Sequence, residues 1–472
     1  MVKVKDSSAP VGDPQPGEYV AGGDQALRKK WHRNLLLCAL KCYNCQFINP
    51  HWLKDERFYV NCPSGARYGF DSYFAGGRVE TTRAIVEGEI QYPTERLTHV
   101  AYACTLCGSC EDVCHYLRDL RPAEVFEALR AKLVEDGVGP LPEHARLRNV
   151  PAAKNPYEEP HERRLALLPG FPAGGGGGGL VYFTGCTAAY RAPEVAKAVG
   201  KLLDRAGFDG WTTMGEDEWC CGSPLFRTGL WKEARQLMKH NLETLHEMRK
   251  ERPDGSLTVV TACAGCARTF KRDYAHHGGD LSGLRVVHVT ELLASKVPPV
   301  TVAGKKFGTE GGPLKFSDAG GLTVAYHDPC HLGRHLGVYD EPRALLKSVP
   351  GLDFREMFRS RFNSYCCGSG GGVKMASREG GSLDGFAGWV ADGRVLEALE
   401  VFEGTRCTDP ALEAEGRGEP PGPTRSKQMP VLVSACPFCR NHLSEAARRA
   451  GGKFEVMDIT ELLLKVGLEE VD

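Results

Sequence analysis

Cys366-Cys367-Gly368-Ser369 repeats a motif that stands earlier in the chain as Cys220-Cys221-Gly222-Ser223. A lone cysteine precedes each vicinal pair, and a Cys-x-x-Cys motif follows it. Two neighbouring sulfurs do not easily reach separate corners around one tetrahedral ion, so this arrangement favours two metals of one cluster. The first five-cysteine set is Cys186, Cys220, Cys221, Cys263 and Cys266, and the second five-cysteine set is Cys330, Cys366, Cys367, Cys436 and Cys439.

The segments around the two sets follow the same order, which indicates an internal duplication. Apolar stretches that begin at Leu180 and Leu322 lead to the lone cysteines, and strands before the Cys-x-x-Cys motifs deliver those cysteines at their ends. Strands followed by helices, with the motifs at strand ends, predict parallel α/β domains. We therefore expect two Rossmann-like α/β domains related by a pseudo-twofold axis, at residues 180–300 and 301–472, the second with an insertion near 403–429.

The N-terminal part carries a different cysteine pattern. Cys104, Cys107, Cys110 and Cys114 have the bacterial ferredoxin spacing, in which three cysteines hold one 4Fe–4S cluster and the fourth serves its neighbour. Because the fourth cysteine of such a run binds the neighbouring cluster, the cluster of Cys104, Cys107 and Cys110 needs a fourth ligand from elsewhere, and we expect Cys62 to supply it. Cys114 would then complete a second one, with Cys38, Cys42 and Cys45. The spacing around Cys38 departs from the usual one, so that residue is either a ligand or a buried helix thiol.

This part is predicted to be α-helical. Pro122 opens an expected helix that ends before Gly137, and an amphipathic helix is expected before Ile90. We therefore expect a disordered tail at residues 1–28, an α-helical ferredoxin-like domain at 29–150 and a flexible Pro/Gly-rich linker at 151–179.

Composition excludes several classes of protein. The chain has 472 residues, 42% hydrophobic and 25% charged, and a net charge of −1, which are typical of a soluble protein that binds no nucleic acid. No apolar run approaches the roughly 20 residues of a membrane span, and the N-terminus has no signal-peptide core. We expect a cytoplasmic protein, with docking on the inner membrane face through a partner as a further option. In a reducing compartment, closely spaced cysteines indicate metal or redox chemistry.

Iron–sulfur chemistry accounts for all but one of the 19 cysteines. A cubane cluster needs four thiolates, and the N-terminal part supplies two such groups. Each five-cysteine set has one thiolate more, which suits an opened cluster with labile iron positions for a substrate sulfur. Zinc sites or iron-free dithiols are the alternatives. Cys407 is left over and is expected to be a surface thiol.

Taken together, these motifs resemble the heterodisulfide reductase family. The resemblance rests on both cysteine sets, on His-Asp-Pro-Cys-His-Leu-Gly-Arg (His327 to Arg334) and on Asn-Ser-Tyr-Cys-Cys-Gly-Ser-Gly-Gly-Gly (Asn363 to Gly372), and covers residues 30–466. It implies the D-subunit type, a ferredoxin-like two-cluster module fused to two cysteine-rich CCG domains. Each complete CCG domain of that family holds a noncubane 4Fe–4S cluster, and the pair splits the heterodisulfide of coenzyme M and coenzyme B. The implied substrate site lies at Cys220, Cys221, Cys366 and Cys367.

We therefore expect an enzyme that passes electrons through two cubane clusters to two noncubane clusters and reduces a disulfide, or oxidises two thiols in reverse. The substrate itself does not carry over from the resemblance. The alternative is an electron-transfer subunit of a flavin-dependent glycolate- or lactate-type dehydrogenase, without substrate chemistry of its own. No flavin or nicotinamide motif is found, so a flavoprotein, a ferredoxin or a membrane cytochrome is the expected electron partner.

A few other residues are candidates for smaller roles. A histidine beside Cys330 (His327, His331 or His335) could donate a proton to a leaving thiol, although such residues more often hold a loop. Arg334 and Lys374 could meet an anionic substrate or be structural. The glycine run at 370–372 favours a close backbone approach and a roomier second site.

Overall fold

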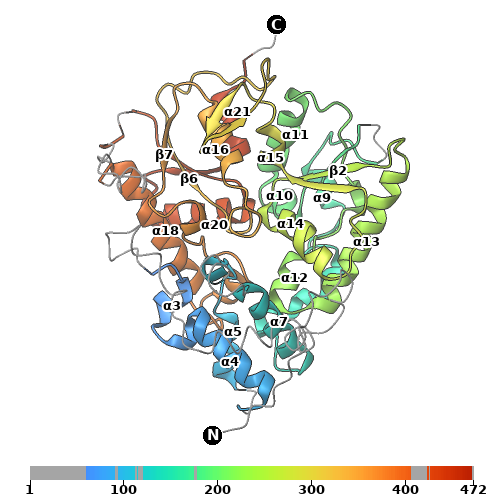
Figure 1. The fold of residues 1–472 in the computed structure, drawn as a ribbon, viewed down its shortest axis with the longest axis vertical. Helices are drawn as coiled ribbons and strands as arrows, with labels where there is room; N and C mark the ends of the chain where they lie inside the picture. The colour runs from blue at the N-terminus through green and yellow to red at the C-terminus, as the bar shows by residue number, and fades with distance from the viewer. Residues whose placement is uncertain are drawn as a thin grey trace.

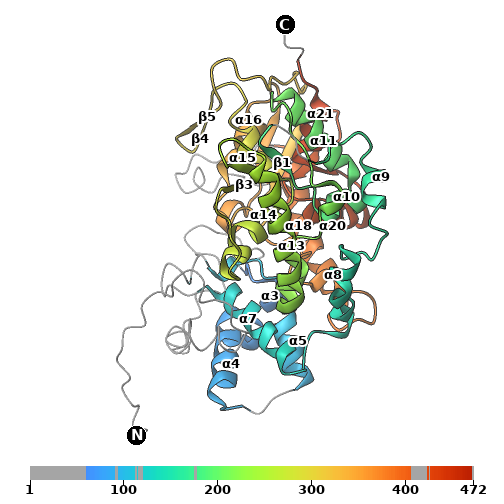
Figure 2. The same cartoon turned by 90° about the vertical axis from the view of Figure 1, so that its right-hand side faces the viewer.

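The computed structural model describes residues 60–90, 94–111, 114, 121–174, 178–405, 422–424 and 426–469. Two α/β lobes lie side by side, and a helical part packs against both at one end (Figures 1 and 2). We call these the first lobe (178–294), the second lobe (322–466) and the helical part (60–149). The expected tail and the predicted ligands Cys38, Cys42 and Cys45 lie outside the described residues, as does Cys407.

The first lobe contains a parallel sheet in the order β1-β2-β3. Its register places Val181 beside Val259 and Val259 beside Val286. The apolar face of the second helix after β1, α11, is buried through Val195, Val199 and Leu202, which recur at helical spacing. Its elements are β1 (Leu180–Tyr182), α10 (Cys186–Arg191), α11 (Pro193–Arg205), η7 (Gly215–Asp217), α12 (Ser223–Thr228), α13 (Trp231–Lys250), β2 (Leu257–Thr261), α14 (Ala264–Arg268), η8 (Thr269–Tyr274), β3 (Leu284–His288) and α15 (Val289–Leu293).

The second lobe contains a parallel sheet in the order β7-β6-β8-β9. The first lobe has only an isolated parallel bridge between Thr212 and Val181 where the second has the edge strand β7. The strand order therefore repeats, and the expectation of parallel α/β domains is confirmed. The elements are β6 (Thr323–His327), α16 (Asp340–Lys347), β7 (Asp353–Glu356), η9 (Arg361–Asn363), α17 (Val373–Ala376), α18 (Phe386–Glu403), β8 (Val431–Ser434), α20 (Pro437–Arg449), β9 (Glu455–Asp458) and α21 (Ile459–Val466).

The last helix of each lobe begins in the same way. His288 caps α15 and Asp458 caps α21, and each is part of a capping box closed by a glutamate three residues later. Helix α11 packs against α21, and α15 packs against α16, so the last helix of each lobe contacts a helix near the start of the other lobe. An antiparallel hairpin of β4 (Val300–Val302) and β5 (Lys305–Phe307) lies between the lobes in sequence.

The helical part presents its longest described helix to both lobes. This helix, α7, begins at Pro122 as predicted and is buried along most of its length. It packs against α4, α5 and α12. The elements are α3 (Pro63–Tyr68), η5 (Asp71–Tyr73), α4 (Ala75–Glu87), α5 (Glu95–Tyr102), α7 (Pro122–Glu135) and η6 (Pro142–Asn149).

The segment expected to be a flexible linker is packed instead. It contains α8 (Val150–Ala153) and α9 (Arg163–Leu167). Arg164 is buried against Glu218 of the first lobe, and Thr213 donates to the carbonyl of Pro172. The expectation of flexibility is therefore wrong for the described part of 151–179, because these contacts fix its path along the first lobe.

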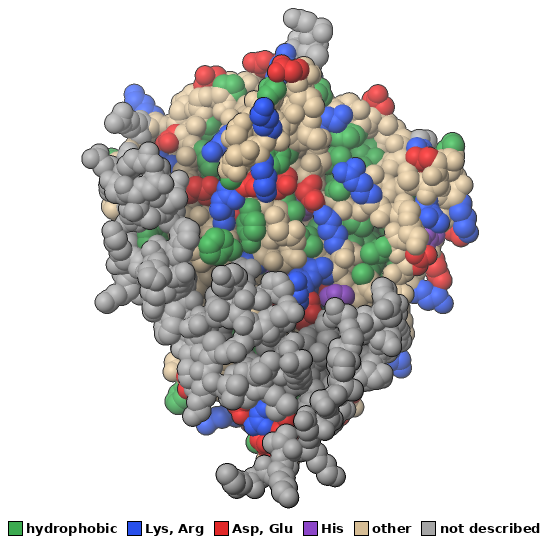
Figure 3. Space-filling view, in the orientation of Figure 1, with side chains coloured by type: hydrophobic (Ala, Val, Ile, Leu, Met, Phe, Trp, Pro, Cys, Tyr) green, Lys and Arg blue, Asp and Glu red, His purple; other side chains and the backbone are tan. Residues whose placement is uncertain are grey.

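Two surface features complete the fold. Acidic and basic side chains are interspersed on the face seen in Figure 3, in line with the balanced net charge. Among the helices that the structure describes, none combines the length and the apolar character needed to cross a bilayer.

Candidate metal centres

Four cysteines of the helical part line a single cavity. They are Cys62, Cys104, Cys107 and Cys110. Cys62 is the N-cap of α3, and the Gly65 amide donates to its sulfur over 3.4 Å. Burial raises the pKa of Cys62 to about 12, so its thiolate needs a compensating positive charge, which a bound metal supplies. This all-sulfur donor set around a cavity fits an iron–sulfur cluster.

The path of the loop explains how consecutive cysteines face this cavity. Leu106 and Gly108 both have left-handed backbone, with φ of 53° and 71°. Such a turn on either side of Cys107 changes the direction of the chain within a few residues. Cys114 is buried nearby in sequence, but the other cysteines predicted for its cluster are not described.

The first five-cysteine set is completely buried, and its members come from the starts of three helices. Cys186 begins α10, Cys220 and Cys221 precede α12, and Cys263 is the N-cap of α14. Hydrogen bonds from Cys220 and then Cys266 hold the pKa of Cys221 well below its usual value. The same contact with Cys221 raises the pKa of Cys266. The thiols are therefore close enough to share protons, as ligands of one cluster would be.

The second five-cysteine set has the same construction. The sulfurs of Cys367 and Cys439 lie 3.2 Å apart. Cys436 is the N-cap of α20, which carries Cys439 in its first turn. Four of the five members are buried, and Cys330 is partly exposed. Within each of the two sets, the structure thus brings together the five cysteines that the sequence pattern had grouped.

The glycine after each vicinal cysteine pair has the same backbone conformation and the same contact with sulfur in both lobes. Gly222 and Gly368 both have φ of 84°, and their amides donate to the sulfurs of Cys220 and Cys366 over 3.4 and 3.3 Å. A Cβ at Gly368 would lie 2.5 Å from the carbonyl oxygen of Ala387. Glycine is required there both for the left-handed turn and for the close packing.

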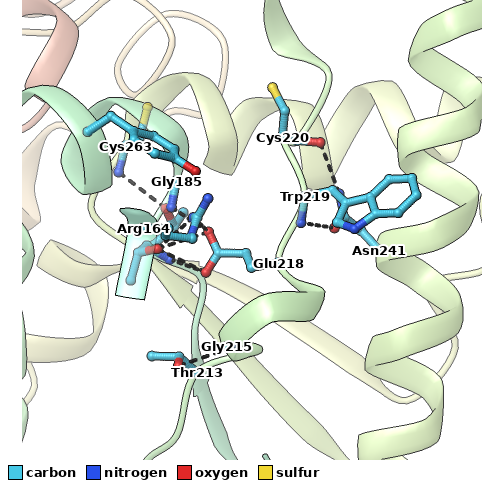
Figure 4. A network of polar contacts seen from close by, with 12 residues as sticks. Arg164, Gly185, Thr213, Gly215, Glu218, Trp219, Cys220, Asn241 and Cys263 are labelled. Atoms are coloured by element: carbon cyan, nitrogen blue, oxygen red, sulfur yellow. Dashed lines mark hydrogen bonds and ion pairs between the residues drawn. The ribbon is translucent and has the colours of Figure 1, made fainter. Parts of the chain in front are cut away.

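A buried carboxylate connects the two loops that carry Cys186 and Cys220. Glu218 accepts hydrogen bonds from the amides of Thr184 and Gly185 over 3.0 and 2.8 Å, and it pairs with Arg164 (Figure 4). On the other side, Asn241 donates to the Cys220 carbonyl over 3.1 Å. These residues fix the loops rather than line the metal site, and sequence reasoning missed them because nothing in the sequence links Arg164 to position 218.

The cysteines of the three parts of the molecule are in contact with one another. Cys263 of the first set and Cys436 of the second are hydrogen-bonded, which lowers the pKa of Cys263 after the larger effect of Cys266. Cys107 of the helical part and Cys366 of the second set are also hydrogen-bonded, and this contact is the main reason why the pKa of Cys107 is low. The second set is therefore close enough to exchange protons with both the helical part and the first set.

The glycine run at 370–372 does not open space for a substrate. A Cβ at Gly371 would lie 2.5 Å from the carbonyl oxygen of Cys104, so this run receives the cysteine loop of the helical part. Arg130 holds the two together, donating to the carbonyls of Gly371 and Cys104 over 2.8 and 2.7 Å. The expectation of a roomier second site is therefore wrong, because the loop fills that space.

Both cations suggested for an anionic substrate have structural partners. Arg334 donates to the carbonyls of Cys107 and Ser364, and it thereby holds the cysteine loop of the helical part against the second lobe. Lys374 pairs with Glu445 over 2.8 Å on the second lobe.

Of the three histidines at the end of β6 and just after it, His327 and His335 are buried and His331 is partly exposed. His331 lies beside the first set, because a Cβ at Gly265 would be 3.8 Å from its Nδ1 and 3.6 Å from the sulfur of Cys263. Burial lowers the pKa of His331 to about 3, so its ring is uncharged at neutral pH. His335 faces Gly108 of the helical part, where a Cβ would lie 2.8 Å from Nε2.

Comparison with known proteins identifies the family. The model of the CCG cysteine-rich domain matches residues 180–271 and 324–384, one segment in each lobe. The D-subunit of the dihydromethanophenazine:CoB–CoM heterodisulfide reductase of Methanosarcina acetivorans is 34% identical over 377 residues, covering 79% of each chain. The chain belongs to the D-subunit family of heterodisulfide reductases. The predicted resemblance is thereby confirmed.

Other relatives of this heterodisulfide reductase D-type chain have different names. The B-subunit of the fumarate reductase (CoM/CoB) of Methanothermobacter marburgensis is 31% identical, over 77% of this chain and 60% of its own length. The EtfAB:quinone oxidoreductase of Syntrophomonas wolfei is 27% identical, over 77% of this chain and 46% of its own length. The family assignment supports an oxidoreductase.

Proposed function

We propose that the chain is the iron–sulfur subunit of an oxidoreductase that reduces a disulfide, or oxidises two thiols in the reverse direction. The observation that carries this proposal is the assembly of two five-cysteine sets that lie next to each other and next to the cysteine loop of the helical part, with Cys107 close to Cys366 and Cys436 close to Cys263. Such an assembly suits delivery of electrons to a site between the lobes. Membership of the family supports the same reading.

The cysteines would hold four clusters. Cys62, Cys104, Cys107 and Cys110 would hold one cubane cluster, and Cys114 with Cys38, Cys42 and Cys45 a second. Each five-cysteine set would hold a noncubane 4Fe–4S cluster. Such clusters, when bound, take up and release single electrons, and an opened one offers iron to a substrate sulfur.

The domain organisation follows from the same assignment. We propose a ferredoxin-like domain at 29–150 and two CCG domains at 180–300 and 301–472. A pseudo-twofold axis between the CCG domains is supported by the reciprocal packing of α11 on α21 and α15 on α16.

Reduction of a disulfide R–S–S–R′ breaks its S–S bond and consumes two electrons and two protons, giving two thiols. Two sets that meet at Cys263 and Cys436 provide one position for each substrate sulfur, so neither sulfur is left as a free thiyl radical. Cys220, Cys221, Cys366 and Cys367 would flank that substrate. The buried surroundings of these residues limit the access of water to the reacting sulfurs.

The electrons must be exchanged with a partner. We propose a flavoprotein, a ferredoxin or a membrane cytochrome that docks on the helical part, because the cysteine loop of that part lies next to the second set. The chain itself would bind neither flavin nor nicotinamide.

The test is anaerobic reconstitution of the full chain, with iron and sulfide analysis followed by EPR in the presence of candidate thiol pairs. About 16 irons per chain are expected, four for each cluster. A signal that broadens with sulfur-33-labelled thiol would support direct binding of a substrate sulfur. Zinc in place of iron would overturn the proposal.

A second function is favoured by the similarity to an EtfAB:quinone oxidoreductase. The chain would then transfer electrons for a flavin-dependent dehydrogenase, of glycolate, lactate or another type, without touching a substrate. The same experiment separates the two functions, because full iron content without any thiol-induced change in the EPR signals supports electron transfer alone.

A further inference from the structure

The two five-cysteine sets differ at one buried position next to their sulfurs. His327 ends β6, three residues before Cys330, and it is 1% exposed. The corresponding residue of the first lobe, three residues before Cys186, is Phe183. Its fully buried ring packs edge-on against Phe270 with ring centroids 4.9 Å apart. A hydrogen-bonding side chain therefore stands beside the second set where an apolar one stands beside the first.

The tautomer of His327 follows from its neighbour. Arg394 donates from Nε to Nδ1 of His327 over 3.0 Å. An arginine has only donors, so Nδ1 must be the acceptor and the ring proton must lie on Nε2. Arg394 is itself fixed by Glu397, 2.9 Å away, and by the Arg359 carbonyl. The orientation of the imidazole is thus set from the side remote from the cysteines.

Cysteine sulfur lies close to the ring of His327. Its Nε2 is buried and has no hydrogen-bond partner in the part of the chain that the structure describes, so its proton is available to a nearby thiolate. A ring nitrogen of His327 and the sulfurs of Cys367 and Cys439 all lie within 4.8 Å of one another. Because Nε2 carries a proton, His327 is not available as a metal ligand, but it can donate to a thiolate.

We infer that His327 is a positioning residue that donates its Nε2–H to the sulfur of Cys367 and thereby raises the reduction potential of the second five-cysteine site. Hydrogen bonds to cluster sulfur stabilise the reduced, more negative state, and they are one of the levers that set cluster potentials. Because Nδ1 accepts from Arg394 and only Nε2 carries a proton, the ring donates as a neutral imidazole, and the effect comes from its N–H dipole.

The location of this donor gives the inference a functional meaning, which rests on the proposed function. The second set is the one in contact with Cys107 of the helical part. A higher potential there would draw an electron from the helical part onto the second site before the first. The duplicated sites would therefore be unequal in their order of reduction, although their cysteines are the same.

The test is an EPR-monitored redox titration of the reconstituted full chain and two variants. His327→Phe copies the first lobe and removes the donor. His327→Gln keeps both interactions, because its amide oxygen can accept from Arg394 and its NH₂ group can donate to sulfur. We expect His327→Phe to shift the midpoint potential of one noncubane signal to a more negative value, and His327→Gln to remain near the wild type, both with unchanged iron content.

Two outcomes would overturn the inference. Equal midpoint potentials for wild type and His327→Phe would show that no donor acts, and an equal shift in both variants would show a merely structural role. If His327→Phe fails to fold, pulsed EPR of wild-type protein with ¹⁵N-labelled histidine decides the question, because the donor predicts one coupled imidazole nitrogen and its absence refutes the donor. A chain that binds no iron removes both this inference and the proposed function, whereas full iron with unmoved potentials removes this inference alone.

Discussion

Arg130 donates a hydrogen bond to the carbonyl oxygen of Gly371 over 2.8 Å, joining residues that are 241 positions apart in the sequence. The same fully buried guanidinium also bonds the carbonyls of Ala101, Tyr102, Cys104 and Arg227. One side chain of α7 therefore holds the helical part against both lobes. Its partners are backbone atoms, so the contact fixes the position of the cysteine loop whatever side chains surround it.

Replacing Arg130 by methionine should destabilise the protein strongly. The substitution leaves several buried carbonyls without a donor, and each such group costs roughly 1–3 kcal/mol. Arg83→Met is a matched control, because Arg83 binds three glutamates on the surface of α4, where such pairs contribute little. Anaerobic chemical denaturation measures both variants, and an Arg130→Met loss no larger than that of Arg83→Met would contradict the proposed clamp.

Gly371→Ala should separate the helical part from the second set. The new Cβ would lie 2.5 Å from the Cys104 carbonyl oxygen, on a backbone with φ of 66°. Gly380→Ala is the control, because Gly380 has φ of 70° and no neighbour within 4 Å of its added Cβ. We expect slower electron transfer from the helical part to the lobes only in Gly371→Ala, measured by rapid-freeze EPR. Equal rates in the two variants would refute the idea that this close approach matters.

Loss of iron should follow the assigned sets and spare Cys407. Cys221→Ser and Cys367→Ser each remove a ligand that would bridge or bind one noncubane cluster, so each should lose about four irons relative to wild type. Cys407→Ser should retain the full amount, since no set needs that thiol. Iron analysis after anaerobic reconstitution checks all three, and iron loss in Cys407→Ser would force a new assignment of ligands.

The contact of His144 with the second lobe should contribute less to the stability of the protein at acid pH. His144 contacts the Gly372 carbonyl through Nε2 over 2.9 Å, and burial lowers its pKa to about 4. The unfolded-state pKa is about 6.5, so the folded state binds the proton less well, and stability present above pH 6.5 is lost as the pH falls towards 4. Between pH 7.5 and 5.5 the loss is roughly 1 kcal/mol.

His144→Gln provides the comparison for this acid effect. Glutamine can still donate to the Gly372 carbonyl, but it does not titrate. Denaturation of both proteins at the two pH values should show a smaller acid loss in the variant. Identical losses would assign the acid sensitivity to other groups.

Much of the fold was accessible from the sequence, because its signals are local. Pro122 marked the start of α7, and the apolar runs at Leu257 and Leu322 marked β2 and β6, since buried parallel strands are continuous apolar segments. The segment Thr-Glu-Leu-Leu occurs at 290–293 and again at 460–463, and in both lobes its glutamate closes a capping box. The grouping of the cysteines followed from their spacing alone.

What the sequence did not predict depends on contacts between distant segments. The glycines at 370–372 suggested open space, because a residue without a side chain does not reveal which neighbour approaches it. The linker looked flexible by composition, yet Arg164 binds Glu218 inside the first lobe. Likewise, the Arg394–His327 hydrogen bond joins two residues 67 positions apart, so no local pattern could set the tautomer of the histidine.

The crossed packing of α11 on α21 and of α15 on α16 has a consequence for any attempt to divide the chain. The last helix of each half covers apolar surface of the other half, so neither half should fold stably by itself. A polypeptide severed at the β4–β5 hairpin should yield two insoluble fragments when they are made separately and one soluble heterodimer when they are made together. The two halves of the chain should therefore depend on each other for folding.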